Sequence, residues 1–405
     1  MRILEFDLEG YLFTFIPMKF TFSICLVFSF LFSFSQEKPK DLYKRLSQKD
    51  RSMIEGNNHK IYPKFSAGLS YGLNLISDDR SYLVEQAEYY SMEFRASYKA
   101  LGYNIYDQLW KYPQWGIGYF NTKLYSEEYL GSPNAVYAFI DVPFKRHEEF
   151  KNWYWSYSIA GGMSFNFRPG NEQDNPLNTM IGSYNNVHID LGVYTHTRLS
   201  DGFDAKMGIS FVHFSNGASS LPNAGINLVG PKVVLQHRMV KERPLTRKVE
   251  IPEWDPKNVI SVLQAFGTKQ LESGGEDFLN TTTAIAYKRW YSYKGMWIIQ
   301  ADLFYDESNN SGLTGRTMVP EDKRDEASNY YSVGLFAGHE AVYNRWSFIA
   351  GWGYYVWREY EYTNSNYQRF GVRYRVFQGL SLGVGLKART FAADYIEYSL
   401  AYNIF

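Results

Sequence analysis

Apolar and polar residues alternate along most of this chain, and that alternation constrains its fold more than any other feature. From Ile61 to the C-terminus, strand-like runs with a period of two are separated by turn residues. We see no amphipathic helix of useful length. The runs cover residues 61–76, 87–99, 115–125, 134–143, 153–166, 186–198, 204–215, 225–240, 257–268, 279–291, 295–307, 330–342, 345–359, 367–377, 380–389 and 394–404. The pattern predicts an all-β, antiparallel protein of about sixteen strands, with twelve to sixteen possible.

The aromatic content favours a transmembrane outer-membrane β-barrel. Aromatic residues make up 18% of the chain, with 35 Tyr and 29 Phe. Outer-membrane barrels carry aromatic girdles at both membrane interfaces, and they have short turns at one end and longer loops at the other. The longer connections are 167–185, 216–224, 269–278 and 308–329, and tight ones occur at 200–202, 292–294, 343–344 and 378–379. A soluble β-sandwich is the alternative, because it produces the same alternation.

Two connections, 100–114 and 241–256, are too long for simple turns. The second could separate a first set of eight strands from the remainder. We therefore predict a barrel over 61–405, with a first part at 61–240 and additional strands at 257–405. The chain ends in Phe405 after an aromatic strand, which is typical of the segment that the barrel assembly machinery reads.

The N-terminal region reads as a secretory signal peptide over residues 1–35, with translation starting at Met18. Lys19 precedes an apolar run from Phe20 to Phe34, and the run contains Cys25, the chain's single cysteine. A membrane anchor helix is the alternative, although the run is short for a span. Residues 36–60 are polar and charged, which predicts a periplasmic tail.

Composition excludes several classes of function. The formal net charge is zero, so nothing indicates a nucleic-acid partner, and a mean hydropathy of −0.37 excludes a polytopic helical membrane protein. The seven histidines are scattered, so no metal site is expected. We find no Gly-rich phosphate loop, and no cofactor is predicted.

The end of the strand at 204–215 carries the residues that suggest chemistry. His213 and Ser215 lie two apart, so they share a face of the strand. A hydroxyl beside an imidazole is the minimum for nucleophilic ester chemistry. The pair belongs to the apolar row of the strand, which faces lipid in a barrel. The pair is therefore predicted on the outer wall, near the loop end.

Strand parity also selects the neighbours of His213. A three-residue loop at 200–202, with Gly202 in the left-handed conformation, places Ile189 opposite His213 and sends Asp190 to the lumen. Asp190 is thus rejected as a triad acid. On the following strand, Asn227 falls opposite His213 and has the parity to hold the imidazole in one tautomer, as in Cys-His-Asn sites.

These residues resemble the PagL-type lipid A 3-O-deacylase family, also labelled acyloxyacyl hydrolases. The motif is His213-Phe214-Ser215-Asn216, followed by Pro222-Asn223 and Gly225-Ile226-Asn227. Further segments resemble longer, Bacteroidota-type members: YPQWGIGYF at 112–120, LGSPNAVYAFIDVPF at 130–144 and NPLNTMIGS at 175–183. The resemblance covers about residues 60–240, and small members of the family are eight-stranded barrels that end soon after the motif.

The resemblance implies a serine esterase that is reached sideways from the outer leaflet. Ser215 would be the nucleophile and His213 the general base. The family has a Glu fourteen residues after the His, where this chain has Asn227. Asn216 or Asn223 would help the backbone stabilise the oxyanion.

The predicted function is an outer-membrane esterase that removes an ester-linked acyl chain from lipid A or lipopolysaccharide, or from another outer-leaflet lipid. Its partners would be that lipid, the outer membrane and the barrel assembly machinery. The alternative is a non-catalytic barrel, a pore or a scaffold, that retains a degenerate motif. A sixteen-stranded barrel can enclose an aqueous channel, and the Glu-to-Asn departure favours that alternative. An unrelated barrel such as an adhesin also stays open.

Overall fold

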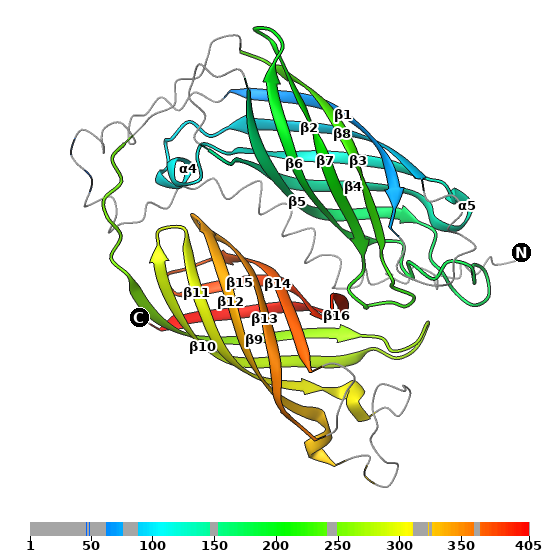
Figure 1. The fold of residues 1–405 in the computed structure, drawn as a ribbon. Coiled ribbons are helices and arrows are strands. Elements are labelled where there is room, and N and C mark those ends of the chain that lie inside the picture. Colours follow the sequence, from blue (N-terminus) through cyan, green and yellow to red (C-terminus); the bar gives the residue numbers. More distant parts are fainter. Residues whose placement is uncertain are drawn as a thin grey trace, which may run out of the picture. The chain divides into compact units, whose positions relative to one another are not determined.

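Sixteen antiparallel strands make up the computed structural model of this chain (Figure 1). The structure describes residues 62–75, 88–145, 153–240, 249–310, 326–359 and 365–404, together with Leu46, Gln48 and Lys323. The predicted signal peptide, almost all of the predicted polar tail and the terminal Phe405 lie outside the described residues.

The first eight strands close into a barrel in which β1 pairs with β8. Neighbouring strands are joined in chain order, so each connection is a hairpin. The strands are β1 (Pro63–Asn74), β2 (Glu88–Lys99), β3 (Gln114–Leu124), β4 (Gly131–Pro143), β5 (Trp153–Phe167), β6 (Asn186–Arg198), β7 (Phe203–Ser215) and β8 (Ile226–Arg238).

The last eight strands close into a second barrel in which β9 pairs with β16. Its strands are β9 (Lys257–Lys269), β10 (Phe278–Ser292), β11 (Gly295–Asp306), β12 (Tyr331–Tyr343), β13 (Trp346–Arg358), β14 (Asn366–Arg375), β15 (Leu380–Arg389) and β16 (Ala392–Ile404). Residues 100–113 after β2 and 144–152 after β4 are long connections at one end of the first barrel, and the turn between β15 and β16 has two residues. The other long connections, including those after β1, β5, β7, β9 and β11, lie where odd-numbered strands end. We call that end of each barrel its loop end.

The all-β class and the count of sixteen strands are confirmed, but the closure differs from a single large barrel. Because β1 pairs with β8 and β9 pairs with β16, the two edge strands of each eight-stranded set are hydrogen-bonded to each other. An eight-stranded barrel has an interior just wide enough for side chains to fill. The described strands therefore do not form the sixteen-stranded channel that the pore alternative required.

Charged side chains fill the middle of the first barrel. Lys232 Nζ lies 2.8 Å from an Asp190 oxygen and 3.0 Å from a Glu93 oxygen, and Arg95 bonds to both carboxylates. These groups are almost completely buried. Since an unpaired buried charge is costly, each ion is held by partners from other strands. Asp190 is thus a lumen residue, as parity predicts.

Helices are few and short among the described residues. The long connection before β3 contains α4 (Ile105–Leu109), which begins with a capping box between Asn104 and Asp107. A second short helix, α5 (Glu127–Leu130), precedes β4. Within the part of the chain that the structure describes, no helix is long and apolar enough to cross a bilayer.

Candidate active site

The predicted His–Ser pair lies on the outer wall of the first barrel, at the loop end of β7. The inner row of β7 is buried, as Lys206, Ser210 and Phe214 show. The alternate row starts exposed at Met207 and Ile209 and continues to His213 and Ser215. Burial increases from Ile209 onward, and Ser215 is 7% exposed. The nucleophile candidate is therefore on the outer face but shielded from bulk solvent.

The register brings the predicted neighbours to His213. β6 places Ile189 opposite it, and β8 places Asn227 opposite it. Both pairings agree with the parity argument. The loop prediction was wrong in one detail, because Gly202 does not have a positive φ. The turn closes instead through hydrogen bonds from the Leu199 and Ser200 N–H groups to the Phe203 carbonyl.

A hydrogen-bonded chain joins three side chains. His213 Nδ1 lies 2.7 Å from Asn227 Oδ1, and His213 Nε2 lies 2.8 Å from Ser215 Oγ. Because an amide oxygen can only accept, Nδ1 carries the proton and donates it to Asn227. Nε2 then presents a lone pair to the serine hydroxyl. This is the tautomer in which the imidazole can take a proton from Ser215.

Gly225 lets the chain pass close to the imidazole. Its φ is +80°, in the left-handed region that favours glycine. A Cβ added there would lie 2.9 Å from His213 Cε1. Two local features therefore favour glycine at position 225: the left-handed backbone conformation and the close approach to the imidazole ring.

A tight turn follows the serine. Ser219 N–H donates to the Asn216 carbonyl at 3.4 Å, and both intervening residues have positive φ, +65° at Gly217 and +61° at Ala218. These angles are those of a type I′ turn. A left-handed alanine costs about 1–2 kcal/mol, so surrounding contacts must hold it.

Asn216 holds the loop together. Its side-chain amide donates to Ser183 Oγ at 2.9 Å and to the Ser220 carbonyl at 2.8 Å. Both amide hydrogens are therefore used within the loop. The predicted direct contribution of this side chain to an oxyanion site does not fit that arrangement.

The side-chain amide of Asn223 retains an available hydrogen-bond donor. Its Oδ1 accepts from the Asn216 backbone N–H at 3.0 Å, which fixes the orientation of the amide. Within the described part of the chain, its Nδ2 makes no hydrogen bond. Of the two asparagines suggested by the sequence, Asn223 is the one with an available donor group.

Residues distant in sequence support this site. Asn74, the last residue of β1, accepts from the Asn227 backbone N–H through Oδ1 at 3.2 Å. Gln270, the residue after β9, donates its N–H to the Ala218 carbonyl at 3.0 Å. Its Oε1 accepts from the Leu221 N–H at 3.4 Å. Sequence spacing gave no indication of Asn74, Ser183 or Gln270, because folding alone brings them to the motif.

Glycine also permits a close contact between the turn and β16. A Cβ added to Gly217 would lie 2.4 Å from Ile396 Cγ1. Together with Gln270, Ile396 shows that the second barrel contacts the loop after Ser215. Within the described ranges, no cluster of three or more His, Cys, Asp or Glu residues is placed to hold a metal.

Two family models match the chain. Residues 92–235 match lipid A 3-O-deacylase (PagL), and residues 258–405 match the C-terminal domain of acyloxyacyl hydrolase. The first match includes the His–Ser–Asn chain, and the second covers most of the second barrel. No curated protein matches the chain.

Solved barrel structures are similar at a low level. A BenF-like porin from Pseudomonas fluorescens is 9% identical with a TM-score of 0.21, covering 86% of this chain and 99% of that one. The translocator domain of the autotransporter NalP from Neisseria meningitidis is 11% identical with a TM-score of 0.18, covering 90% and 95%. At these scores the similarities carry no argument about this chain.

Proposed function

From the premise that the chain belongs to the PagL lipid A 3-O-deacylase family and carries an acyloxyacyl hydrolase C-terminal domain, we propose that it is an outer-membrane serine esterase that removes an ester-linked acyl chain from lipid A. The observation that carries the proposal is the chain Ser215–His213–Asn227, with hydrogen bonds of 2.8 and 2.7 Å. It lies on the outer wall of a β-barrel, where a lipid acyl chain can reach it without entering the lumen.

Acylation begins with His213 Nε2 taking the proton of Ser215 Oγ while the oxygen attacks the ester carbonyl carbon. The carbonyl oxygen becomes an oxyanion, and the Asn223 Nδ2 donor is our candidate to stabilise it. One such donor contributes about 10²–10³ in kcat. The intermediate collapses when the ester C–O bond breaks, and the protonated imidazole returns its proton to the leaving sugar oxygen. The acyl group stays on Ser215.

Deacylation repeats these steps with water as the nucleophile. His213 takes a proton from water, the resulting hydroxide attacks the acyl carbonyl, and Ser215 leaves with the proton from the imidazolium. The products are a free fatty acid and the lipid with one acyl chain fewer. Asn227 holds the ring in position through both halves, but it supplies no negative charge for the imidazolium.

The outer surface supports a membrane location. Apolar side chains are exposed around both barrels, including Leu69 at 68%, Ile209 at 63% and Ile299 at 64%. Lumen side chains on the same strands are polar or charged, as Ser66 on β1 and Lys206 on β7 are. This apolar-out, polar-in alternation is typical of transmembrane barrels. With the longer loops outward, Ser215 would sit at the depth of the outer-leaflet headgroups.

The test is the mass of lipid A after expression in a Gram-negative outer membrane. We expect the loss of one acyl chain with the unaltered protein and no loss with Ser215→Ala. Ser381→Ala, on β15 of the second barrel, is the matched control and should leave the loss unchanged. Folding of each variant is checked by the gel shift of the unheated barrel. Lipid A of unchanged mass beside folded, unaltered protein would contradict the proposal.

A further inference from the structure

The outer wall of the first barrel contains a glycine that packing within the protein does not explain. Gly161 belongs to the outward row of β5, in which Trp155, Ile159 and Phe165 are exposed. A Cβ added to Gly161 would have no atom within 4 Å, and this holds for no other glycine of the described strands. The wall is therefore indented at Gly161, and we call this indentation the wall notch.

The usual structural reasons for a glycine in a strand do not apply to Gly161. Such a glycine often marks a bulge, a tight bend or a place where a ligand or another backbone comes close. The pairing of β5 with β4 and with β6 is regular on both sides of Gly161, and its φ is not positive. No backbone atom lies against its outward face. Of these reasons, the approach of a ligand is the one that the structure leaves open.

Aliphatic side chains surround the wall notch. Ile159 and Met163 lie two residues away from Gly161 along β5, on the same face of the strand. Ile189 is its partner on β6, and its partner on β4 is Ala138, another small residue. The wall notch is thus an apolar indentation with larger side chains on three sides.

The wall notch lies in the same row across the strands as the candidate general base. Ile189 is paired with Gly161 on one side and with His213 on the other. Since neighbouring strands are about 4.8 Å apart, Gly161 is about 10 Å from His213 along the wall. A long acyl chain held at Ser215 can span that distance, whereas a short one ends before it.

This row also leads away from the loop end. β7 ends at Ser215, two residues after His213, whereas β5 ends at Phe167, six residues after Gly161. Strands of a transmembrane barrel are tilted, so a row at right angles to them descends on one side. From His213 to Gly161 the row descends, which is the direction in which an acyl chain leaves headgroup depth for the bilayer interior.

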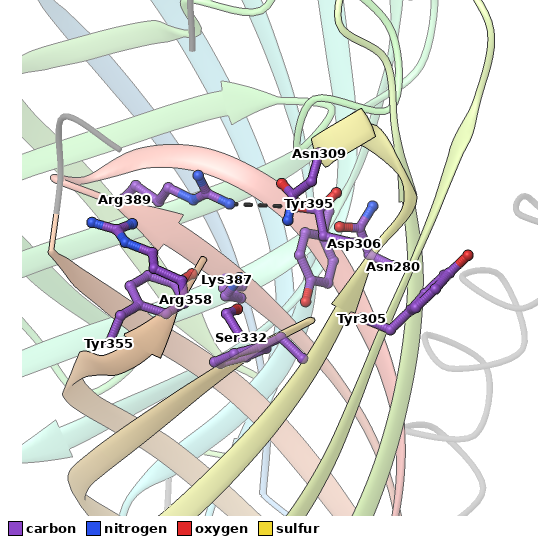
Figure 2. A pocket seen from close by; sticks show the side chains of 11 residues that line it. Asn280, Tyr305, Asp306, Asn309, Ser332, Tyr355, Arg358, Lys387, Arg389 and Tyr395 are labelled. Atoms are coloured by element: carbon purple, nitrogen blue, oxygen red, sulfur yellow. Dashed lines mark hydrogen bonds and ion pairs between the residues drawn. The ribbon is translucent and has the colours of Figure 1, made fainter. Parts of the chain in front are cut away.

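A cavity inside the second barrel provides a contrast with the wall notch. Figure 2 shows its charged lining, in which Arg389 points to Asp306 and pairs with it at 3.5 Å. Its volume is about 10 Å³, close to the space of one water molecule. That cavity does not accommodate an acyl chain, whereas the wall notch is apolar and open to lipid.

We propose that Gly161 is a specificity-determining residue of the esterase, and that the wall notch seats part of the acyl chain that is removed. The inference rests on the proposed function, because it takes the occupant to be the chain of an ester held at Ser215. Lipid tails are as apolar as aliphatic side chains, so moving the chain from lipid to the wall yields little by itself. The wall notch selects instead through van der Waals contacts, which only a chain long enough to reach Gly161 can make.

The test compares hydrolysis of p-nitrophenyl palmitate and p-nitrophenyl butyrate by the purified protein in detergent micelles. Gly161→Leu fills the wall notch, and the variant should fold because an added Cβ meets no atom. One methylene group more or less in an apolar pocket changes kcat/KM about 10-fold to 200-fold. We therefore expect kcat/KM for the palmitate to fall at least tenfold and that for the butyrate to stay unchanged. Gly161→Ala should cause a smaller fall with the palmitate.

Ala67→Leu is the matched control. Ala67 is a small, exposed residue in the outward row of β1, which is two strands from β7 on the side away from β5. It pairs with Leu235 and lies outside the row that joins His213 to Gly161. Both esters should be hydrolysed by Ala67→Leu at the unaltered rate. The gel shift of the unheated barrel checks the folding of each variant.

Two results with the esters would overturn the proposal: equal changes with the palmitate and the butyrate in Gly161→Leu, or the same selective fall in Ala67→Leu. The mass of lipid A after expression separates this proposal from the proposed function. If lipid A loses an acyl chain but Gly161→Leu hydrolyses both esters normally, the wall notch fails and the esterase stands. If lipid A keeps its chains while Gly161→Leu selectively loses the palmitate, the assignment to lipid A fails and the wall notch stands. Folded, unaltered protein that hydrolyses neither lipid A nor the esters would refute both.

Discussion

The two barrels share an architecture but differ at one stretch of outer wall. Each has eight antiparallel strands and an interior filled by ion pairs. In the first barrel, the outward row at the end of β7 carries an imidazole and a hydroxyl beside the Asn227 amide. In the second, the outward row of β15 is aliphatic and is paired with aliphatic and tyrosine side chains of β16, for example Leu382 with Leu400 and Val384 with Tyr398. The eight-stranded barrel is therefore a framework that both halves share. A few outward polar side chains at the strand ends distinguish the candidate active site from the corresponding outer face of the second barrel.

The contacts to the loop after Ser215 show a second difference between the barrels. Gln270 and Ile396 belong to the second barrel, yet they touch the loop that follows Ser215. Among its described residues the second barrel has no hydrogen-bonded Ser–His–Asn chain, but its contacts support the loop beside that chain in the first barrel. The following experiments separate these two roles.

Gly225→Ala should have the largest effect after loss of the serine itself. The added methyl group would lie 2.9 Å from His213 Cε1, and the alanine would have to adopt a φ of +80°. A displacement of about 1 Å in a reacting group can cost about 100-fold in rate, so we expect a comparable fall in kcat/KM. Gly379→Ala, at φ +86° in the turn before β15, is the matched control. It imposes similar backbone strain without an imidazole nearby and should keep its activity. Equal losses in both would show that strain, not the histidine contact, is responsible.

Asn227 substitutions should have an intermediate effect. Asn227→Ala removes the acceptor for His213 Nδ1 and should lower kcat about tenfold, as expected for one lost hydrogen bond. Asn227→Glu supplies a charge that stabilises the imidazolium and should raise kcat. Asn258→Ala, whose amide accepts from Tyr287 on the second barrel, is the control. If kcat with Asn227→Glu is no higher than that of the unaltered protein, the missing negative charge at position 227 does not limit the rate.

Gln270→Ala should have the smallest effect. It removes the side-chain bond to Leu221 N–H but keeps the backbone bond to Ala218, so we expect kcat to fall about threefold to fivefold. Gln270→Glu retains the acceptor and should restore most of the rate. Gln264→Ala, within β9 and bonded to Thr283, is the control. A fall in thermal stability with unchanged kcat would assign Gln270 to inter-barrel packing alone.

Much of the architecture was predictable because it is local. The alternation located every strand, with boundaries that differ from the structure by a few residues at most. Parity placed His213, Ser215 and Asn227 on one face and sent Asp190 inside, because side-chain direction in a strand depends on residue number alone. The same local argument could not find Ser183 or Asn74, which reach the site through pairings between distant segments.

The sequence by itself determined the strands, their faces and the residues that we propose for ester chemistry. The tertiary structure decided how the edges close, since a hydrogen-bonding edge is satisfied equally by any strand of suitable length. Pairing β1 with β8 and β9 with β16 produced two filled barrels instead of one wide channel. It also brought Gln270 to the loop after Ser215 and gathered Lys387, Arg389 and Tyr355 around one cavity of the second barrel. The spacing of residues in the sequence does not specify these contacts, because they depend on which sequence-distant strands pair at their edges.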